Sequence, residues 1–246
     1  MNSISPNLNI MIKASEKASK VLIRDFGELE NLQVSMKGPR DFVTNSDKKV
    51  EKILIEELLK AKKNFSILSE EAGHIENSDK NNTWVIDPID GTINFLHGVP
   101  HFAISIALKS NNEIISGLIF DPIKNEIFYA EKNSGAYFNN HRIRVSKKNN
   151  LNDCLFGTNL AGAIKSDLNT RITGCAALDL AYTGAGRFDG FYQNGINLWD
   201  IAAGVIIVEE AGGKVNDLNK FETDNINIRA SNNNINKKML EKLSNF

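Results

Sequence analysis

The first quarter of the chain contains two stretches in which apolar residues recur at intervals of three and four. This is the spacing of a helix with one buried face. The first stripe follows Ser5-Pro6, a pair typical of a helix start, and consists of Met11, Ala14, Ala18, Val21, Leu22 and Phe26. The second follows Thr44 to Asp47 and consists of Val50, Ile53, Leu54, Leu58 and Ala61. The pattern predicts two packing helices, with Asp47 in the first turn of the second.

Between residues 65 and 138 the pattern changes to short segments that are continuously apolar or alternate between apolar and polar positions. Such segments are typical of strands. They cover residues 65–68, 84–86, 102–108, 113–120, 126–130 and 137–138. Turn residues at Asn111-Asn112 and Asp121-Pro122 separate the later segments, which predicts an antiparallel meander from residue 102 onward.

After a polar run over residues 146–152, strand and helix patterns alternate to the end of the chain. The predicted strands are 154–160, 188–193, 214–218 and 226–231, and the predicted helices are 175–186, 199–211 and 233–243. Because domain boundaries fall in polar segments, we divide the chain into an N-terminal α+β lobe, residues 1–145, and a C-terminal α/β lobe, residues 146–246.

Composition narrows the class of protein without naming a function. Of the 246 residues, 41% are hydrophobic, which is enough for the core of an ordinary globular protein. There is no apolar run of about 18 residues and no signal-peptide pattern, so we expect a cytoplasmic protein with no membrane partner. The net charge of −1 supplies no basic field, and we therefore do not expect nucleic acid as a partner.

The stretch from Trp84 to Phe95 carries the most informative chemistry. Its apolar run ends in Asp87 and Asp90, which flank Pro88 and can point to one side of the strand's carboxyl end. Gly91 follows, where the backbone can approach a ligand closely and free N–H groups suit a phosphate. An isolated Asp-Pro-x-Asp-Gly is more often an ordinary turn, so the interpretation depends on what accompanies it.

Acidic residues also stand at the ends of three other predicted elements, namely Asp47, Glu70 with Glu71, and Asp200. Crowded carboxylates repel one another, so a fold that brings them together does so around cations. Oxygen ligands without His or Cys suit Mg²⁺, which is the usual partner of phosphate oxygens. Two such ions can activate water and stabilise a leaving alkoxide, which predicts hydrolysis of a phosphate ester.

Together these motifs resemble the inositol monophosphatase family of Mg²⁺-dependent, lithium-sensitive phosphatases. The matching segments span nearly the whole chain and are DFVTNSD (41–47), SEE (69–71), DPIDGTINF (87–95), WDIAAG (199–204) and EAGG (210–213). The resemblance implies a layered α/β sandwich, in which an antiparallel sheet with helices is followed by a smaller mixed sheet with helices. It also implies a homodimer.

The resemblance further implies a set of metal ligands. Glu70, Asp87 and the Ile89 carbonyl would hold one Mg²⁺, while Asp87, Asp90 and Asp200 would hold a second. Every metal-binding carboxylate of the family pattern is thus present in this chain. By the same resemblance, Glu70 is expected to be a catalytic residue as well as a metal ligand.

Roles for the neighbouring residues follow from the same resemblance. Thr92 would orient the attacking water, and Asp47 would polarise the Thr92 hydroxyl. The amides of Gly91 and Thr92 would bind the phosphate group. Asp90 and the Ala176 backbone would contact the alcohol part of the substrate.

Two departures from the family pattern concern the substrate and the oligomer. Family members usually carry a Glu that binds inositol hydroxyls seven residues before the Asp of the Trp-Asp motif, and this chain has Gln193 there. The segment between Gly157 and Gly174 is short where relatives have a full helix. The leading hypothesis is a phosphatase that acts on a small phosphate ester, inositol monophosphate. The alternatives are a fructose-1,6-bisphosphatase, a 3′-phosphoadenosine 5′-phosphate phosphatase, and a non-catalytic binding protein of the transcription machinery.

Overall fold

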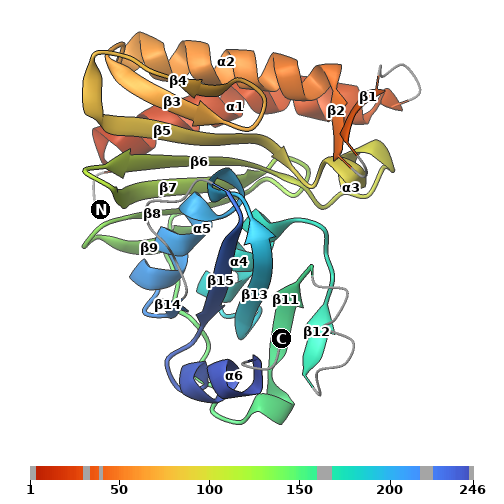
Figure 1. Ribbon diagram of the computed structural model, residues 1–246, viewed down its shortest axis with the longest axis vertical. Coiled ribbons are helices and arrows are strands. Elements are labelled where there is room, and N and C mark those ends of the chain that lie inside the picture. Colours follow the sequence, from red (N-terminus) through yellow and green to blue (C-terminus); the bar gives the residue numbers. More distant parts are fainter. Residues whose placement is uncertain (1–3, 30–33, 39–40, 160–167, 217–223, 244–246) are drawn as a thin grey trace.

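Two β-sheets of unequal size are stacked with helices between them and outside them (Figure 1). The computed structural model describes residues 4–29, 34–38, 41–159, 168–216 and 224–243. From one side to the other, the layers are two helices, an eight-stranded sheet, two helices, a five-stranded sheet and one helix. The predicted layered α/β architecture is therefore confirmed.

The outermost layer of the first lobe consists of α1 (Pro6–Phe26) and α2 (Asn45–Ala61). The Ser5 side chain caps α1 by accepting the Leu8 N–H at 3.2 Å, as the Ser-Pro pair predicts. The apolar stripes of both helices pack on the large sheet. However, the buried face of α2 also carries two carboxylates, Asp47 and Glu51, so this face does more than fill the core.

The large sheet contains eight strands, in the spatial order β10-β9-β8-β7-β6-β5-β3-β4. They are β3 (Phe65–Ser69), β4 (Gly73–Ile75), β5 (Asp79–Asp90), β6 (Ala103–Ser110), β7 (Glu113–Asp121), β8 (Glu126–Glu131), β9 (Gly135–Phe138) and β10 (His141–Arg142). The predicted meander is confirmed from β6 onward, where every neighbouring pair is antiparallel. A further hairpin, β1 (Val34–Gly38) with β2 (Asp41–Thr44), was not predicted.

One pair of strands departs from the predicted antiparallel sheet. β3 runs parallel to β5, because the short strand β4 turns back along the sheet edge before β5 begins. In this register Ser69 lies opposite Ile86. The residues that come next along the two strands, Glu70 just after β3 and Asp87 within β5, are therefore delivered to the same place.

The smaller sheet is mixed, as predicted, with the order β12-β11-β13-β15-β14. Its strands are β11 (Leu155–Thr158), β12 (Asn169–Arg171), β13 (Gly190–Ile196), β14 (Lys214–Asn216) and β15 (Ile226–Ser231). Strand β11 pairs in parallel with β12 and with β13. Strand β15 pairs antiparallel with β13 on one side and with β14 on the other. The 3₁₀ turn η2 (Leu151–Asp153) leads into β11, and α6 (Asn236–Leu243) covers the outer face. Parts of the predicted strands 154–160 and 214–218 lie outside the described residues.

The helices between the sheets are α4 (Ala176–Gly184) and α5 (Leu198–Glu210), and both contact both sheets. Their apolar side chains build the largest buried cluster of the molecule. The two helices approach each other closely at Gly204, where a Cβ atom would lie 2.4 Å from the Leu180 Cβ. This contact sets the spacing of α4 and α5, one helical turn after Asp200.

The connection between the lobes runs from Arg142, at the end of β10, to Leu151, at the start of η2. Our proposed division between residues 145 and 146 falls within it. Within the ranges described, none of the helices has the length and apolar character needed to cross a membrane.

We expect Gly204→Ala to destabilise the protein by about 1–3 kcal/mol, because the added methyl group overlaps the base of Leu180 and forces the helices apart. Urea unfolding of the purified variant measures this. Gly27→Ala is the matched control, since at the end of α1 its Cβ would lie 3.3 Å from the Arg24 carbonyl oxygen and 3.7 Å from that of Ile23, well short of the overlap at Gly204. Equal unfolding midpoints for both variants would contradict the close helix contact.

Candidate active site

Three buried or half-buried carboxylates from two lobes meet at one corner of the large sheet. Asp87 and Asp90 come from the end of β5, and Asp200 comes from the first turn of α5. One carboxylate oxygen from each lies within 4.8 Å of the others. The structure thus brings together three of the predicted metal ligands, which lie up to 113 residues apart in the sequence (from 87 to 200).

A bulge in β5 explains why Asp87 and Asp90 face the same way. Residues three apart in a regular strand point to opposite faces. Here Asp87 pairs with Ser105 and Asp90 with Ala103, so β5 carries one extra residue between the two pairs. Pro88, which has no N–H, sits in this bulge, and the Ile89 N–H donates to Asp87 Oδ1 at 2.9 Å. The bulge turns both carboxylates toward the metal corner.

Asp200 is positioned by the start of α5. Its Oδ2 accepts the backbone N–H of Asn197 at 3.1 Å, which is the contact of a capping-box residue at a helix N-terminus. Asp200 therefore has a structural role at the start of α5. It can also take part in the carboxylate cluster with Asp87 and Asp90, because a carboxylate has two oxygens.

Glu70 lies next to this group but outside the closest set of three. Its backbone N–H donates to the Ile86 carbonyl at 3.3 Å, which continues the parallel pairing of β3 and β5. Its side chain is near enough to help raise the pKa of Asp87. Glu70 therefore belongs to the same electrostatic cluster.

Burial and mutual repulsion raise the pKa values of the carboxylates in the cluster. Burial, followed by repulsion from Glu70, Asp90 and Asp200, raises the pKa of Asp87 well above its ordinary value. Burial and Asp200 raise the pKa of Asp90 to about 7, and burial raises the pKa of Asp200 to about 6. A hydrogen bond from Asp87 to Asp200 lets the pair share a proton.

Such a set of donors fits a hard divalent cation. All the side-chain ligands are carboxylates, and a cation would replace the shared proton and relieve the repulsion between them. Zn²⁺ and copper sites usually include His or Cys. The only cysteine at this corner is Cys175, which donates a hydrogen bond to Asp90. Burial raises the pKa of Cys175 well above its ordinary value, so its side chain is a neutral thiol.

Thr92 lies at the edge of the cluster with its hydroxyl between two acceptors. Its Oγ1 is 3.0 Å from the Ile89 carbonyl oxygen and 3.5 Å from Asp47 Oδ1, the outer limit of a hydrogen bond. Asp47 is fully buried on α2. Gly91 precedes Thr92 with φ of +94°, and a Cβ there would lie 3.1 Å from the His101 carbonyl oxygen. Only glycine fits this turn comfortably, as the sequence predicts.

The N-terminus of α4 closes the site from the second lobe. Asp90 Oδ2 accepts the Ala177 N–H at 2.5 Å and the Cys175 thiol at 3.1 Å. Ala176, predicted to contact substrate, is the first residue of this helix and is buried. Asp90 of the first lobe therefore caps helix α4 of the second. The N-cap residue of α4 is Cys175, and its side chain makes no capping hydrogen bond.

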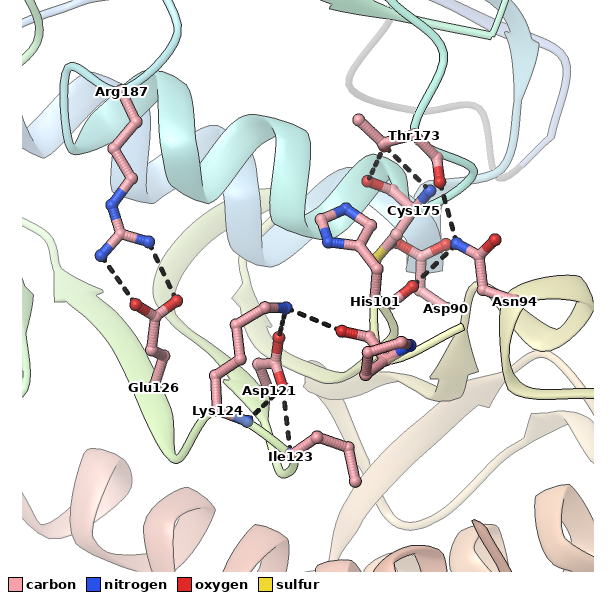
Figure 2. Close-up of polar contacts among 11 residues, drawn as sticks. Asp90, Asn94, His101, Asp121, Ile123, Lys124, Glu126, Thr173, Cys175 and Arg187 are labelled. Carbon is pink, nitrogen blue, oxygen red and sulfur yellow. Dashed lines mark hydrogen bonds and ion pairs between the residues drawn. The ribbon is translucent and has the colours of Figure 1, made fainter. Parts of the chain in front are cut away.

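Asn94 makes a second tie between the lobes that the sequence did not predict (Figure 2). Its Nδ2 donates at 2.8 Å to the His101 carbonyl and at 2.8 Å to the Thr173 carbonyl. Thr173 in turn donates to Asp179 Oδ1 at 2.8 Å. The loop in front of α4 is thus fixed to the segment that carries Gly91 and Thr92.

Gln193 is half-buried on β13, opposite Ile228. Its backbone carbonyl accepts Nη1 of Arg229 at 3.1 Å. Its side-chain oxygen Oε1 is buried without a hydrogen-bond partner among the residues the structure describes. A buried acceptor of this kind suits a donor from a bound molecule, such as a hydroxyl group.

A layered fold that gathers buried carboxylates at a strand end fits a metal-dependent phosphomonoesterase. Comparison with known proteins supports this class and narrows it. The sequence matches the inositol monophosphatase family over residues 4–245, and the chain belongs to that family. The predicted resemblance is therefore confirmed.

The relatives carry two kinds of name. An inositol-1-monophosphatase from Rhizobium meliloti is 44% identical over 221 residues, which cover 84% of this chain and 83% of the relative. Nus factor SuhB from Escherichia coli is 39% identical over 227 residues, which cover 86% and 85% respectively. The crystal structure of extragenic suppressor protein suhB from Bartonella henselae aligns with a TM-score of 0.92 and 44% identity, over 97% of this chain and 98% of that one.

The raised pKa values predict how stability depends on pH. As the pH rises, the metal-free protein should lose stability while the stabilisation that Mg²⁺ adds should grow. Because the folded-state pKa values of Asp87, Asp90 and Asp200 lie above their ordinary values, the cluster stabilises the metal-free protein at low pH. This contribution is lost as the pH rises toward about 7. Mg²⁺ binds the deprotonated form, so its stabilising effect grows over the same range.

Thermal melting in EDTA and in saturating Mg²⁺, at about pH 5 and about pH 8, measures this difference. Other titrating groups affect both series equally and cancel. We expect the increase in Tm caused by Mg²⁺ to be much larger at the higher pH. An increase that does not change with pH would show that these carboxylates do not bind the ion.

Proposed function

We propose that the protein hydrolyses inositol monophosphate to inositol and phosphate with Mg²⁺ as its cofactor. The observation that carries the proposal is the corner where Asp87, Asp90 and Asp200 lie within 4.8 Å of one another. The 44% identity to a protein named inositol-1-monophosphatase supports the choice of substrate. Retention of all the predicted metal carboxylates favours an enzyme over a protein that only binds a partner.

In this proposal the carboxylates of Asp87, Asp90 and Asp200, with Glu70 and the Ile89 carbonyl, would hold two Mg²⁺ ions. When bound, the ions would supply a lowered pKa of water and charge to stabilise the leaving alkoxide. The protein's own part is to hold these ligands rigidly. The bulge of β5 and the first turn of α5 do so before any ligand arrives.

Thr92 would orient the attacking water. Its single hydroxyl proton is directed to the Ile89 carbonyl or to Asp47, which leaves the lone pairs of Oγ1 free to accept a hydrogen bond. A water molecule that donates to Oγ1 is held with its own lone pair turned away from Thr92. Asp47 would keep the hydroxyl in this orientation.

The backbone of Gly91 and Thr92 would bind the phosphate, and α4 would meet the alcohol. The Gly91 N–H lies near the carboxylate of Asp90 and helps to lower its pKa. The tie from Asp90 to Ala177 brings the backbone of Ala176 to the same corner. The phosphate would then be held by the first lobe, and the alcohol by Asp90 of that lobe together with the Ala176 backbone of the other.

A regulatory role is the second candidate function, and the 39% identity to a protein named Nus factor SuhB supports it. In that case the chain would bind a partner and the carboxylates would not be needed. Fructose-1,6-bisphosphate and 3′-phosphoadenosine 5′-phosphate remain the alternative substrates.

We also propose that the protein is a cytoplasmic homodimer. Three of its exposed large apolar side chains, Ile93, Val99 and Ile172, lie along the segments that Asn94 joins. Exposed apolar residues that gather in one region are typical of an interface. Sedimentation equilibrium of the purified protein measures its mass in solution.

A phosphate-release assay over inositol, sugar and nucleotide phosphates, with and without Mg²⁺, tests the proposed function. We expect the highest kcat/KM for inositol monophosphate and no turnover in EDTA. Asp200→Asn should lower kcat by at least about 10²–10³-fold, the effect of losing one preorganised electrostatic group. Asp153→Asn, which changes an exposed carboxylate of the same lobe, is the control. Turnover by Asp200→Asn near that of the parent would rule out the metal assignment.

Gln193→Glu tests whether this residue reads the substrate. A carboxylate can accept hydrogen bonds from two neighbouring hydroxyls, whereas an amide has one acceptor and one donor group. Because bonds to charged groups contribute about 1.5–3 kcal/mol against about 1 for neutral ones, kcat/KM for inositol monophosphate should rise on the order of tenfold. Activity on a bisphosphate should fall, since the added negative charge repels a second phosphate. An unchanged ratio of the two activities would show that residue 193 does not contact the substrate.

A further inference from the structure

Helix α2 directs two buried carboxylates toward the active site from one face. Asp47 is fully buried and Glu51, one turn later, is 6% exposed. Residues four apart on a helix share a face, so both point toward the edge where β3 and β5 end. Asp47 approaches the Thr92 hydroxyl. Glu51 has a different target, the loop that carries Glu70.

A single oxygen of Glu51 holds this loop on both sides of Glu70. Glu51 Oε1 accepts the hydroxyl of Ser69, the backbone N–H of Glu71 at 3.0 Å and the backbone N–H of Ala72 at 3.1 Å. The bonds involve the residue before Glu70 and the two residues after it. Charged acceptors make stronger hydrogen bonds than neutral ones, so this is a firm attachment.

The attachment fixes the backbone of the loop that carries Glu70. Ser69 pairs with Gly73 across the β3–β4 hairpin, so the loop consists of Glu70, Glu71 and Ala72 alone. The Glu70 N–H is bound to the Ile86 carbonyl of β5 at 3.3 Å. Three consecutive backbone N–H groups of this short loop thus bind groups outside it, two of them to Glu51. Without Glu51, the loop would lose the backbone bonds of Glu71 and Ala72.

We propose that Glu51 is a positioning residue that fixes the Glu70 loop beside Asp87 and thereby strengthens Mg²⁺ binding. The inference rests on the proposed function, in which Glu70 is a metal ligand. Groups that orient metal ligands typically change metal affinity by about 10–100-fold when they are replaced. The competing explanation is that Glu51 stabilises the hairpin with no effect on the metal.

Calorimetric titration of the metal-free protein with Mg²⁺, without substrate, separates these explanations. We expect Glu51→Gln to weaken Mg²⁺ binding by about 10–100-fold, because a neutral amide oxygen holds the three donors less firmly than a charged carboxylate oxygen does. Ser69→Ala, which removes one of the three bonds and leaves Glu51 and Glu70 in place, should weaken it less. Glu56→Gln is the matched control, since Glu56 lies on the same helix with its side chain 59% exposed.

A double-mutant cycle tests whether Glu51 acts through Glu70. If it does, Glu51→Gln should have little further effect on the Mg²⁺ affinity of Glu70→Gln. Unchanged affinity in both Glu51→Gln and Ser69→Ala, or equal effects of Glu51→Gln with and without Glu70, would overturn the inference. A lowered melting temperature in EDTA with normal Mg²⁺ affinity would assign Glu51 a structural role only. Failure of the parent itself to bind Mg²⁺ would overturn the proposed function as well.

Discussion

Repulsion between buried carboxylates is the constraint on which the rest of this structure depends. Asp87, Asp90 and Asp200 are held within 4.8 Å of one another, and Glu70 lies close by. Bringing them together in a buried corner opposes folding unless a proton or a cation offsets the charge. The apolar clusters on the two faces of the large sheet supply the stability that keeps the carboxylates in place.

The same residues join the two lobes. Asp90 belongs to the large sheet, yet one of its oxygens accepts the Ala177 N–H at the start of α4. Asn94 adds a bond to the Thr173 carbonyl, just before that helix. Some of the contacts that join the two lobes are therefore made by residues of the active site itself. A change that loosens the lobe contact should be felt first at Asp90.

The sequence predicted the elements of this site better than it predicted their arrangement. Asp87, Asp90 and Asp200 were recognisable because each ends or begins a strongly patterned element and because the motifs resemble a known family. The bulge that turns Asp87 and Asp90 to one face was not foreseen, although Pro88 marks its position. The parallel pairing of β3 with β5 was missed because β4 is a three-residue strand in a polar stretch.

Glu51 and Asn94 were missed for a related reason. A Glu within a helix usually lies on the solvent side, and only the fold shows that Glu51 faces the Glu70 loop. Asn94 was visible within the motif, but its partner Thr173 lies 79 residues away and carries no matching signal. Contacts made by backbone groups at such a distance leave no pattern in a single sequence.

Proton release on metal binding tests the central claim most directly. Titration with Mg²⁺ at about pH 6.5, in two buffers that differ in ionisation enthalpy, gives the number of protons displaced per protein. Because the pKa of Asp90 is about 7 and that of Asp87 is well above its ordinary value, the carboxylates hold protons at this pH. Mg²⁺ should displace at least about one of them, and the apparent binding enthalpy should differ between the buffers. Equal enthalpies in the two buffers would contradict a site built from mutually repelling, protonated carboxylates.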